Sequence, residues 1–190
     1  MRMKPEDKVY QAYFELQEKK LYYNQIKECT KLSHSSLQNA LGKLTKERIL
    51  ALEKTKQNSF YNMANKKLFA LKFSEIAVRK FSQLNIGVKN PLKHFLEELP
   101  KGIFTIVLFG SASRKEETAR SDIDILVVSD KKLNLKANKR NAEVASKYPL
   151  SIFEATVSQF MECKDDVIQQ ARKTGFPIHK EQNYYEAVLE

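Results

Sequence analysis

Residues 108–128 read LFGSASRKEETARSDIDILVV, and this stretch decides the fold of the C-terminal half of the chain. The apolar run over 103–109 ends at a Gly-Ser pair, which predicts a buried strand followed by a turn. A charged segment then leads to a second apolar strand, 122–128. Asp122 and Asp124 are two residues apart in this strand, so their side chains are expected to project together from one face.

The paired carboxylates predict a divalent metal site. Two like charges about 4 Å apart repel by roughly 4 kcal/mol at an effective dielectric near 20, so such a pair needs a cation or a shared proton. Mg²⁺ (or Mn²⁺) prefers oxygen ligands and shares them with substrate phosphates. Gly110 allows the backbone to approach a phosphate, and Ser111 offers a hydroxyl and an amide where a helix begins. The alternative, an edge strand with two solvated acids, conflicts with the apolar ILVV that follows.

The same residues carry a resemblance to a known family. Gly110-Ser111, ten residues and then Asp122-x-Asp124 resemble the signature of minimal nucleotidyltransferases, part of the DNA polymerase beta superfamily. LFGSASR resembles the usual LFGSxAR, and SDIDILV resembles SDIDLLV. The resemblance covers about 86–182 and implies a small mixed sheet flanked by helices. It also implies that Asp122 and Asp124 bind Mg²⁺ as catalytic residues, and that Gly110 and Ser111 bind the phosphates of ATP or another nucleoside triphosphate.

Active members of this family usually have a third carboxylate on a later strand. That strand is expected at 150–157 (LSIFEATV), where Glu154 is the only acid. Glu154 is therefore the candidate for a third metal ligand and catalytic residue, although a shift of one residue in strand register would turn it to the other face. Arg114 follows the signature closely and is a candidate for phosphate binding, with a solvated loop cation as the alternative.

The N-terminal half carries nearly all of the excess positive charge. The chain has a net charge of +10; residues 1–100 hold 19 Lys and Arg against 10 Asp and Glu, and residues 101–190 hold 14 against 13. A basic module beside a near-neutral one is expected to face a polyanion. The alternative is that the charge serves solubility alone.

Apolar spacing and capping residues predict a winged helix-turn-helix in this basic half. The expected helices, hairpin strands and final long helix are 5–20, 23–31, 34–47 with Ser33 as N-cap, 48–54, 59–64 and 64–84. The order resembles winged helix-turn-helix modules over about 5–63. The resemblance rests on this pattern and not on a specific motif.

In such modules the third helix enters the major groove of double-stranded DNA and the wing contacts the backbone. Gln and Asn can read adenine there, and Lys can reach guanine or phosphate. The candidate DNA-binding residues are Ser35, Gln38, Asn39, Lys43, Lys54 and Lys56. The alternative for the helix residues is an ordinary solvated face. A homodimer is expected if the DNA site is palindromic.

The predicted fold class is therefore α+β, with a winged helix-turn-helix domain at 1–85 and a mixed-sheet nucleotidyltransferase domain at 86–190. The boundary is placed at 85–91, where Gly87 and Pro91 break the helical period. Farther along the chain we expect helices at 133–149 and 160–175, around the strand at 150–157, and then a short strand, FPIH at 176–179.

Localisation is expected to be cytoplasmic. No apolar run approaches the roughly 18–20 residues of a membrane span, and the first residues lack the apolar core of a secretory signal. The two cysteines, Cys29 and Cys163, are far apart in sequence and fit small buried residues better than a disulfide framework.

Two functions compete at this point. The first is a Mg²⁺-dependent enzyme that moves a nucleoside monophosphate, with AMP from ATP as the expected case, to an acceptor. The family resemblance implies an antitoxin that adenylylates a separate HEPN-type partner protein. The second is a transcriptional regulator whose nucleotidyltransferase-like domain binds nucleotide without turnover. A third hypothesis is a basic interaction module with a degenerate enzyme fold. Loss of either aspartate would favour it, but both are present.

Overall fold

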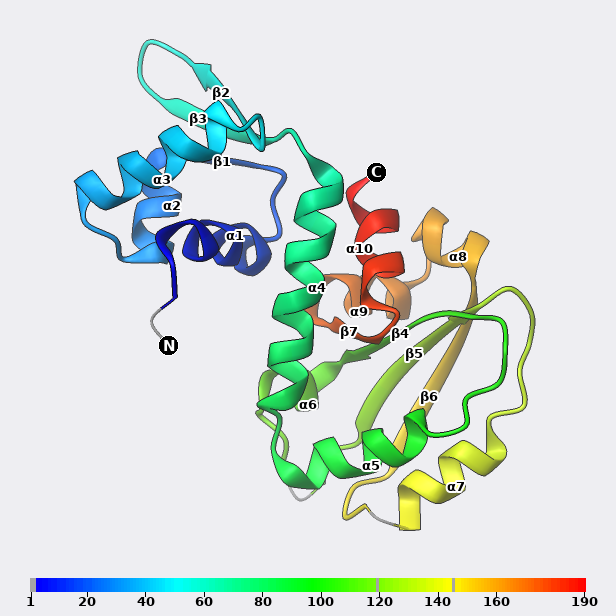
Figure 1. The fold of residues 1–190 in the computed structure, drawn as a ribbon. Helices are drawn as coiled ribbons and strands as arrows, with labels where there is room; N and C mark the ends of the chain where they lie inside the picture. The colour runs from blue at the N-terminus through cyan, green and yellow to red at the C-terminus, as the bar shows by residue number, and fades with distance from the viewer. Residues whose placement is uncertain (1–2, 119, 145) are drawn as a thin grey trace. The chain divides into compact units, whose positions relative to one another are not determined.

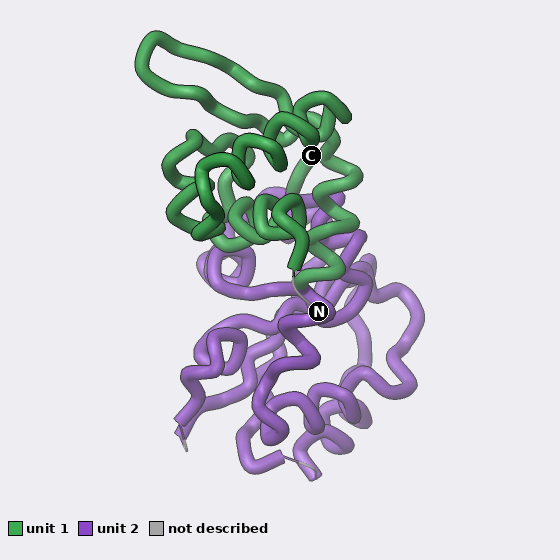
Figure 2. The backbone as a smooth tube through the Cα atoms, turned by 60° about the vertical axis from the view of Figure 1, so that its left-hand side comes forward, with its two compact units in different colours: residues 1–76, 189–190 green, residues 77–188 purple. Residues whose placement is uncertain are grey.

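The computed structural model describes residues 3–118, 120–144 and 146–190, and these form two compact units. Unit 1 runs to Ile76 and includes Leu189–Glu190, and unit 2 is Ala77–Val188 (Figure 2). The division falls inside helix α4 (Lys66–Ser82). The helical spacing of apolar residues continues across it, so the sequence pattern does not indicate a boundary there. Residues 85–91, where the sequence places the boundary, instead contribute to helix α5 (Ile86–Leu96), with Pro91 inside it.

Unit 1 is a helical module closed by a small antiparallel sheet. Its elements before α4 are α1 (Pro5–Leu16), β1 (Lys20–Tyr22), α2 (Tyr23–Thr30), α3 (His34–Lys46), β2 (Leu50–Lys54) and β3 (Ser59–Met63) (Figure 1). The strands lie in the order β1-β3-β2. The predicted hairpin and the Ser33 N-cap are confirmed, because β2 pairs with β3 and the Ser33 hydroxyl accepts a hydrogen bond from the Ser36 N–H at 3.3 Å.

The first helix is shorter than its apolar spacing predicts. It ends at Leu16, because Gln17 takes a left-handed backbone conformation (φ 55°) and its N–H closes the helix on Tyr13 O. The chain then forms β1, a strand absent from the sequence prediction. Three residues carry too little pattern to predict a strand, and β1 exists because it pairs with the free edge of β3.

An aromatic cluster forms much of the core of unit 1. The Phe69 ring lies edge-on to Tyr10 and Tyr13, with centroid distances of 5.1 and 5.2 Å. The Tyr13 side chain is completely buried, and its hydroxyl donates to Tyr61 O at 2.7 Å. The polar end of this ring is therefore satisfied inside the core, as a buried phenol requires.

Unit 2 is built on a four-stranded mixed sheet, which confirms the predicted α+β fold of this part. Its helices and strands after α5 are β4 (Ile103–Phe109), α6 (Gly110–Arg114), β5 (Ile123–Ser129), α7 (Lys136–Val144), β6 (Leu150–Thr156), α8 (Val157–Glu162), α9 (Asp166–Thr174), β7 (Phe176–His179) and α10 (Glu181–Leu189). The strand order is β6-β5-β4-β7. Strand β4 is antiparallel to both neighbours, and β5 is parallel to β6 (Figure 1).

The two central strands bury both of their faces. Ile125 and Val127 on one face, and Leu126 and Val128 on the other, are at most 1% exposed. Helix α9 covers the face that carries Leu126, because a side chain at Gly175, at the end of α9, would meet Val107 Cγ1 at 2.9 Å, and Val107 lies opposite Leu126 in the register. In β4, Val107 and Leu108 on opposite faces are also completely buried, so the apolar run of 103–109 is a strand enclosed by the fold, as predicted.

The predicted helix at 160–175 is wrong in one respect, because the chain forms two helices there. Cys163 takes a left-handed conformation (φ 52°) and ends α8. Asp165 then caps α9 by accepting hydrogen bonds from the N–H groups of Val167 and Ile168. A capping carboxylate at an interior position of an apolar period is the signal that separates the two helices.

Across the described ranges no helix has both the length and the apolar character that a membrane crossing requires.

Candidate active site

The carboxylate pair lies at the start of β5. Asp122 immediately precedes the strand, and Asp124 is its second residue. In the strand register Asp124 lies opposite Phe109 of β4 and Ser151 of β6, so the three side chains share one face. The Ser151 hydroxyl donates a hydrogen bond to Asp122 Oδ2 at 2.9 Å. The structure therefore brings Asp122, Asp124 and Ser151 together.

The pKa of Asp124 is raised above its ordinary value. Partial burial at the end of the sheet is the largest cause, and the negative charge of Asp122 adds to it. Both effects disfavour the ionised carboxylate. A cation placed between the two side chains would reverse this balance, because it neutralises the charge that burial and repulsion penalise.

Position 110 requires a glycine because its backbone lies close to the Asp124 side chain. It follows β4, begins α6 and has a left-handed backbone conformation (φ 71°). A Cβ atom at this position would collide with Asp124 Oδ2. Glycine therefore serves both the turn and the close approach of backbone to carboxylate. Ser111 follows in the first turn of α6, where backbone N–H groups have no acceptor within the helix.

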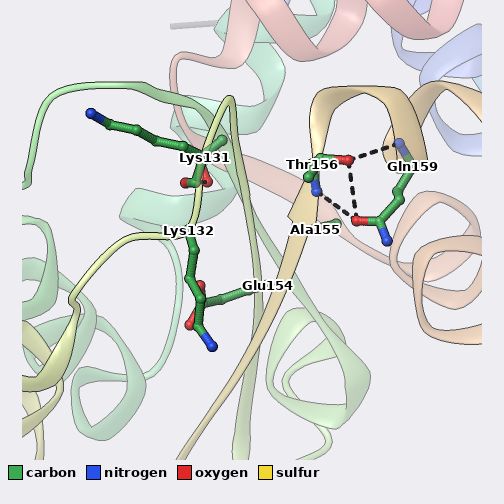
Figure 3. Close-up of a pocket in the computed structure, with 7 residues that line it drawn as sticks. Lys131, Lys132, Glu154, Ala155, Thr156 and Gln159 are labelled. Carbon is green, nitrogen blue, oxygen red and sulfur yellow. Dashed lines mark hydrogen bonds between the residues drawn. The ribbon is translucent and has the colours of Figure 1, made fainter.

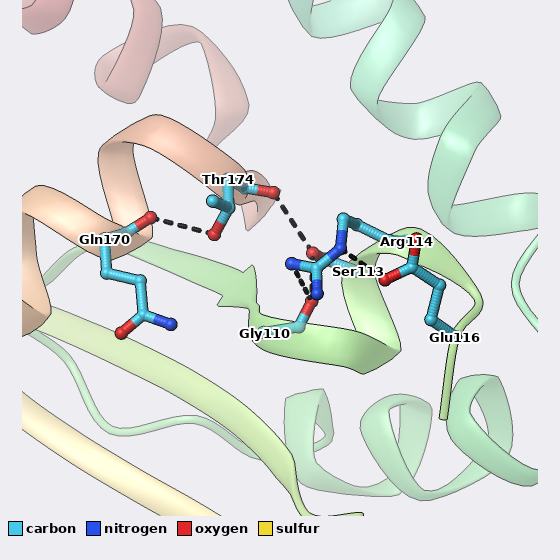
Figure 4. A network of polar contacts seen from close by, with 6 residues as sticks. All are labelled: Gly110, Ser113, Arg114, Glu116, Gln170 and Thr174. Atoms are coloured by element: carbon cyan, nitrogen blue, oxygen red, sulfur yellow. Dashed lines mark hydrogen bonds and ion pairs between the residues drawn. The ribbon is translucent and has the colours of Figure 1, made fainter. Parts of the chain in front are cut away.

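Arg114, the predicted phosphate-binding residue, contacts its own turn. Its Nη1 donates to Gly110 O at 3.2 Å, and its Nε pairs with Glu116 at 2.7 Å (Figure 4). The guanidinium therefore already has two partners from its own segment. Its side chain is 45% exposed, so the remaining N–H groups stay accessible to an anion.

Ser113 is a site residue that the sequence does not reveal. Its side chain is buried, and its Oγ lies 2.8 Å from Gly110 O and 3.1 Å from Thr174 O (Figure 4). The hydroxyl can donate to one carbonyl at a time and thereby links the turn to the end of α9. A serine next to polar residues carries no such signal in the sequence, because its partner is 61 residues away.

Glu154, the predicted third carboxylate, is not brought to the pair. In the parallel register Glu154 lies opposite Val127, so it projects from the face opposite to Asp124. Its side chain lines a separate cavity of about 310 Å³ together with Lys131, Lys132 and Gln159 (Figure 3). The residue of β6 that meets the pair is Ser151, and only the strand register identifies it.

The donor set suits a hard divalent cation. Asp122 and Asp124 offer carboxylate oxygens, and the close packing of Gly110 keeps Asp124 in place. Within the described residues no group of three or more His, Cys, Asp or Glu side chains gathers to hold a metal. A divalent ion held by these two carboxylates alone would have coordination positions left for other oxygen ligands.

The predicted DNA-binding residues all lie in unit 1 on exposed positions. Ser35, Gln38 and Asn39 are exposed on α3, and Lys54 and Lys56 are exposed at the tip of the β2–β3 hairpin. Lys43 differs, because its Nζ forms an ion pair with Glu6 of α1 at 2.9 Å. Its charge is therefore partly neutralised before any polyanion arrives.

Comparison with known proteins agrees with the geometry of unit 2. The family model described as "Nucleotidyltransferase domain" matches residues 90–185, half of the chain. The matched segment includes the Gly110 turn, both aspartates and β6, and it contains no residue of unit 1. Searches of curated proteins and of solved structures returned no match to the chain.

Proposed function

Since the chain belongs to the nucleotidyltransferase domain family, we propose that unit 2 transfers a nucleoside monophosphate from a nucleoside triphosphate to an acceptor, with AMP from ATP as the first case to test. The observation that carries this proposal is the contact of the Gly110 turn with Asp124, beside Asp122. This contact supports the proposal, because a turn that binds phosphate and a carboxylate pair that binds the metal have to lie side by side to hold one metal–triphosphate complex.

The chemistry asks for positioning and charge neutralisation. An acceptor oxygen attacks the α-phosphorus, a new oxygen–phosphorus bond forms, the bond to the bridging oxygen breaks, and pyrophosphate leaves. The acceptor proton passes to water. Gly110 and Ser111 hold the phosphates, and Asp122 and Asp124 hold the divalent cation in place. When bound, Mg²⁺ would neutralise phosphate charge in the transition state.

A nucleotide sensor without turnover is the second candidate function. The observation that favours it is the position of Glu154 on the face away from the carboxylate pair. Two carboxylates are sufficient to bind a metal–nucleotide complex, whereas active members of the family usually have a third carboxylate for catalysis. The acceptor in the enzymatic case is proposed to be a separate protein, of the HEPN type if the chain is an antitoxin.

Unit 1 is proposed to bind double-stranded DNA as a winged helix-turn-helix. The support is the order α1-β1-α2-α3-β2-β3 with a three-stranded antiparallel sheet, together with the polar exposed positions of α3. The exposed lysines of the hairpin add positive charge where a wing would contact the backbone. A protein of this kind would repress or activate its own promoter.

Label transfer from α-³²P-ATP decides between the two functions of unit 2. The full chain is incubated with Mg²⁺, each labelled nucleotide in turn and a lysate of the source organism. A labelled band that disappears in Asp122→Asn and Asp124→Asn, but persists in Glu154→Gln, supports transfer and identifies the acceptor by its mass. Nucleotide binding without any labelled product supports the sensor instead.

A further inference from the structure

Ser151 occupies the position on β6 that faces the carboxylate pair. It lies opposite Asp124 in the parallel register, and its hydroxyl contacts Asp122 Oδ2 at 2.9 Å. The side chain at this position therefore contacts Asp122 and lies on the same face of the sheet as Asp124. No other residue of β6 combines these two relations within the described part of the chain.

The charge at this position determines how many cations the site can hold. Asp122 and Asp124 together carry two negative charges, which one divalent ion balances. A second divalent ion would need another anionic ligand, because two such ions repel each other strongly at short distance. The hydroxyl of Ser151 is neutral, and no third acid gathers at the pair in the described residues.

The hydroxyl also restrains one of the acids. By donating to Oδ2, Ser151 limits the rotation of the Asp122 carboxyl group, which precedes β5 and lacks the restraint of the strand ladder. The contact at the same time uses the serine proton, so the hydroxyl presents its own lone pairs to the site. A carboxylate at position 151 would instead repel Asp122 unless a further cation were bound.

We propose that the site holds a single divalent cation on Asp122 and Asp124, and that Ser151 is the positioning residue that orients Asp122 for it. The inference rests on the metal site of the proposed function and adds the number of ions and the residue that sets it. It predicts that a carboxylate introduced at position 151 creates a second ion site.

Binding of Mn²⁺ alone to the full chain tests this number directly. Free Mn²⁺ is measured by electron paramagnetic resonance during titration, a readout that needs no turnover. We expect one ion for the wild type and two for Ser151→Asp. Ser151→Ala should bind one ion about fivefold more weakly, since a net hydrogen bond is lost, and Ser151→Thr should restore the affinity.

Glu154→Gln is the matched control, because it removes an acid of the same strand from the opposite face. It should leave both the number of ions and the affinity unchanged. The proposal is overturned by two ions in the wild type, by one ion in a folded Ser151→Asp, or by loss of an ion in Glu154→Gln. If Ser151→Asp does not fold, equal affinities of the wild type and Ser151→Ala overturn the positioning role.

Asp122→Asn and Asp124→Asn separate this inference from the proposed function. Each should abolish Mn²⁺ binding, and unchanged binding in both would overturn the metal site itself. The label-transfer assay is run independently on the wild type. One bound ion without any labelled product speaks against transfer and leaves the assignment of Ser151 standing.

Discussion

The backbone of Gly110 lies so close to the carboxylate of Asp124 that no side chain fits between them. This contact joins the turn after β4 to the first residues of β5, which are neighbours in the sheet but separated by a charged loop in the sequence. It makes the glycine part of the metal site and not only of the turn. The stability of the turn and the integrity of the site should therefore change together.

Gly110→Ala should destabilise the protein and impair metal binding. An alanine at φ 71° is strained, and its methyl group displaces Asp124, so we expect a loss of about 2–4 kcal/mol in the free energy of unfolding. Chemical denaturation measures this loss. Gly42→Ala is the control, because Gly42 is exposed in α3 with open space around its Cβ position; it should stabilise by about 0.5–1 kcal/mol. A free energy of unfolding for Gly110→Ala equal to that of the wild type would contradict the close contact between Gly110 and Asp124.

Asp124→Asn should raise the melting temperature of the metal-free protein at pH 7. The folded state raises the pKa of Asp124, so it binds the proton more tightly than the unfolded chain does. The wild type therefore loses stability as the pH rises from the ordinary pKa of an aspartate through the raised pKa of Asp124, whereas the variant does not. Thermal scans from pH 3 to 8 with a chelator should show the gain only above this window.

Mg²⁺ should raise the melting temperature of the wild type above that of Asp124→Asn. The cation binds the ionised Asp124 and stabilises the folded state by mass action, whereas the Asn variant has lost a ligand charge. A melting temperature of Asp124→Asn below that of the wild type at pH 7 without metal would show that burial does not penalise this carboxylate.

Ser113→Ala should loosen the link between the Gly110 turn and α9. Removing the buried hydroxyl leaves Gly110 O and Thr174 O without this donor, at a cost of about 1–2 kcal/mol in unfolding free energy. Ser82→Ala is the control, because Ser82 is an exposed serine that also donates to a carbonyl, and it should change stability by less than about 0.5 kcal/mol. Equal effects of the two substitutions would argue against a special role of Ser113.

Lys54→Ala/Lys56→Ala should weaken binding to duplex DNA from the organism's own promoters. Each lysine is expected to neutralise one phosphate, so the slope of log affinity against log salt should fall in magnitude by about 2. Fluorescence anisotropy at several salt concentrations measures the slope. Lys43→Ala should have a smaller effect, because Glu6 already pairs with Lys43, and Glu6→Gln should strengthen binding. Binding that does not depend on salt would contradict the proposed DNA interface.

Local pattern was sufficient for the features whose partners are near in sequence. Asp122 and Asp124 share a face because a strand alternates its side chains, and Gly110 follows an apolar run that is long enough only for a strand. The Ser33 cap and the tip of the β2–β3 hairpin were predictable for the same reason. These features depend on the residues of one segment, so the sequence alone determined them.

Only the tertiary structure decided which residue of β6 meets the carboxylate pair. Position 151 and position 154 are on the same strand, and their faces are assigned by the parallel register with β5, which places Asp124 opposite Ser151 and Val127 opposite Glu154. The partners of Ser113 and the strand β1 were equally out of reach, because they depend on segments distant in the chain. Register follows from the hydrophobic patterns of the paired strands and from the connections between them, so β6 alone does not fix which of its faces meets Asp124.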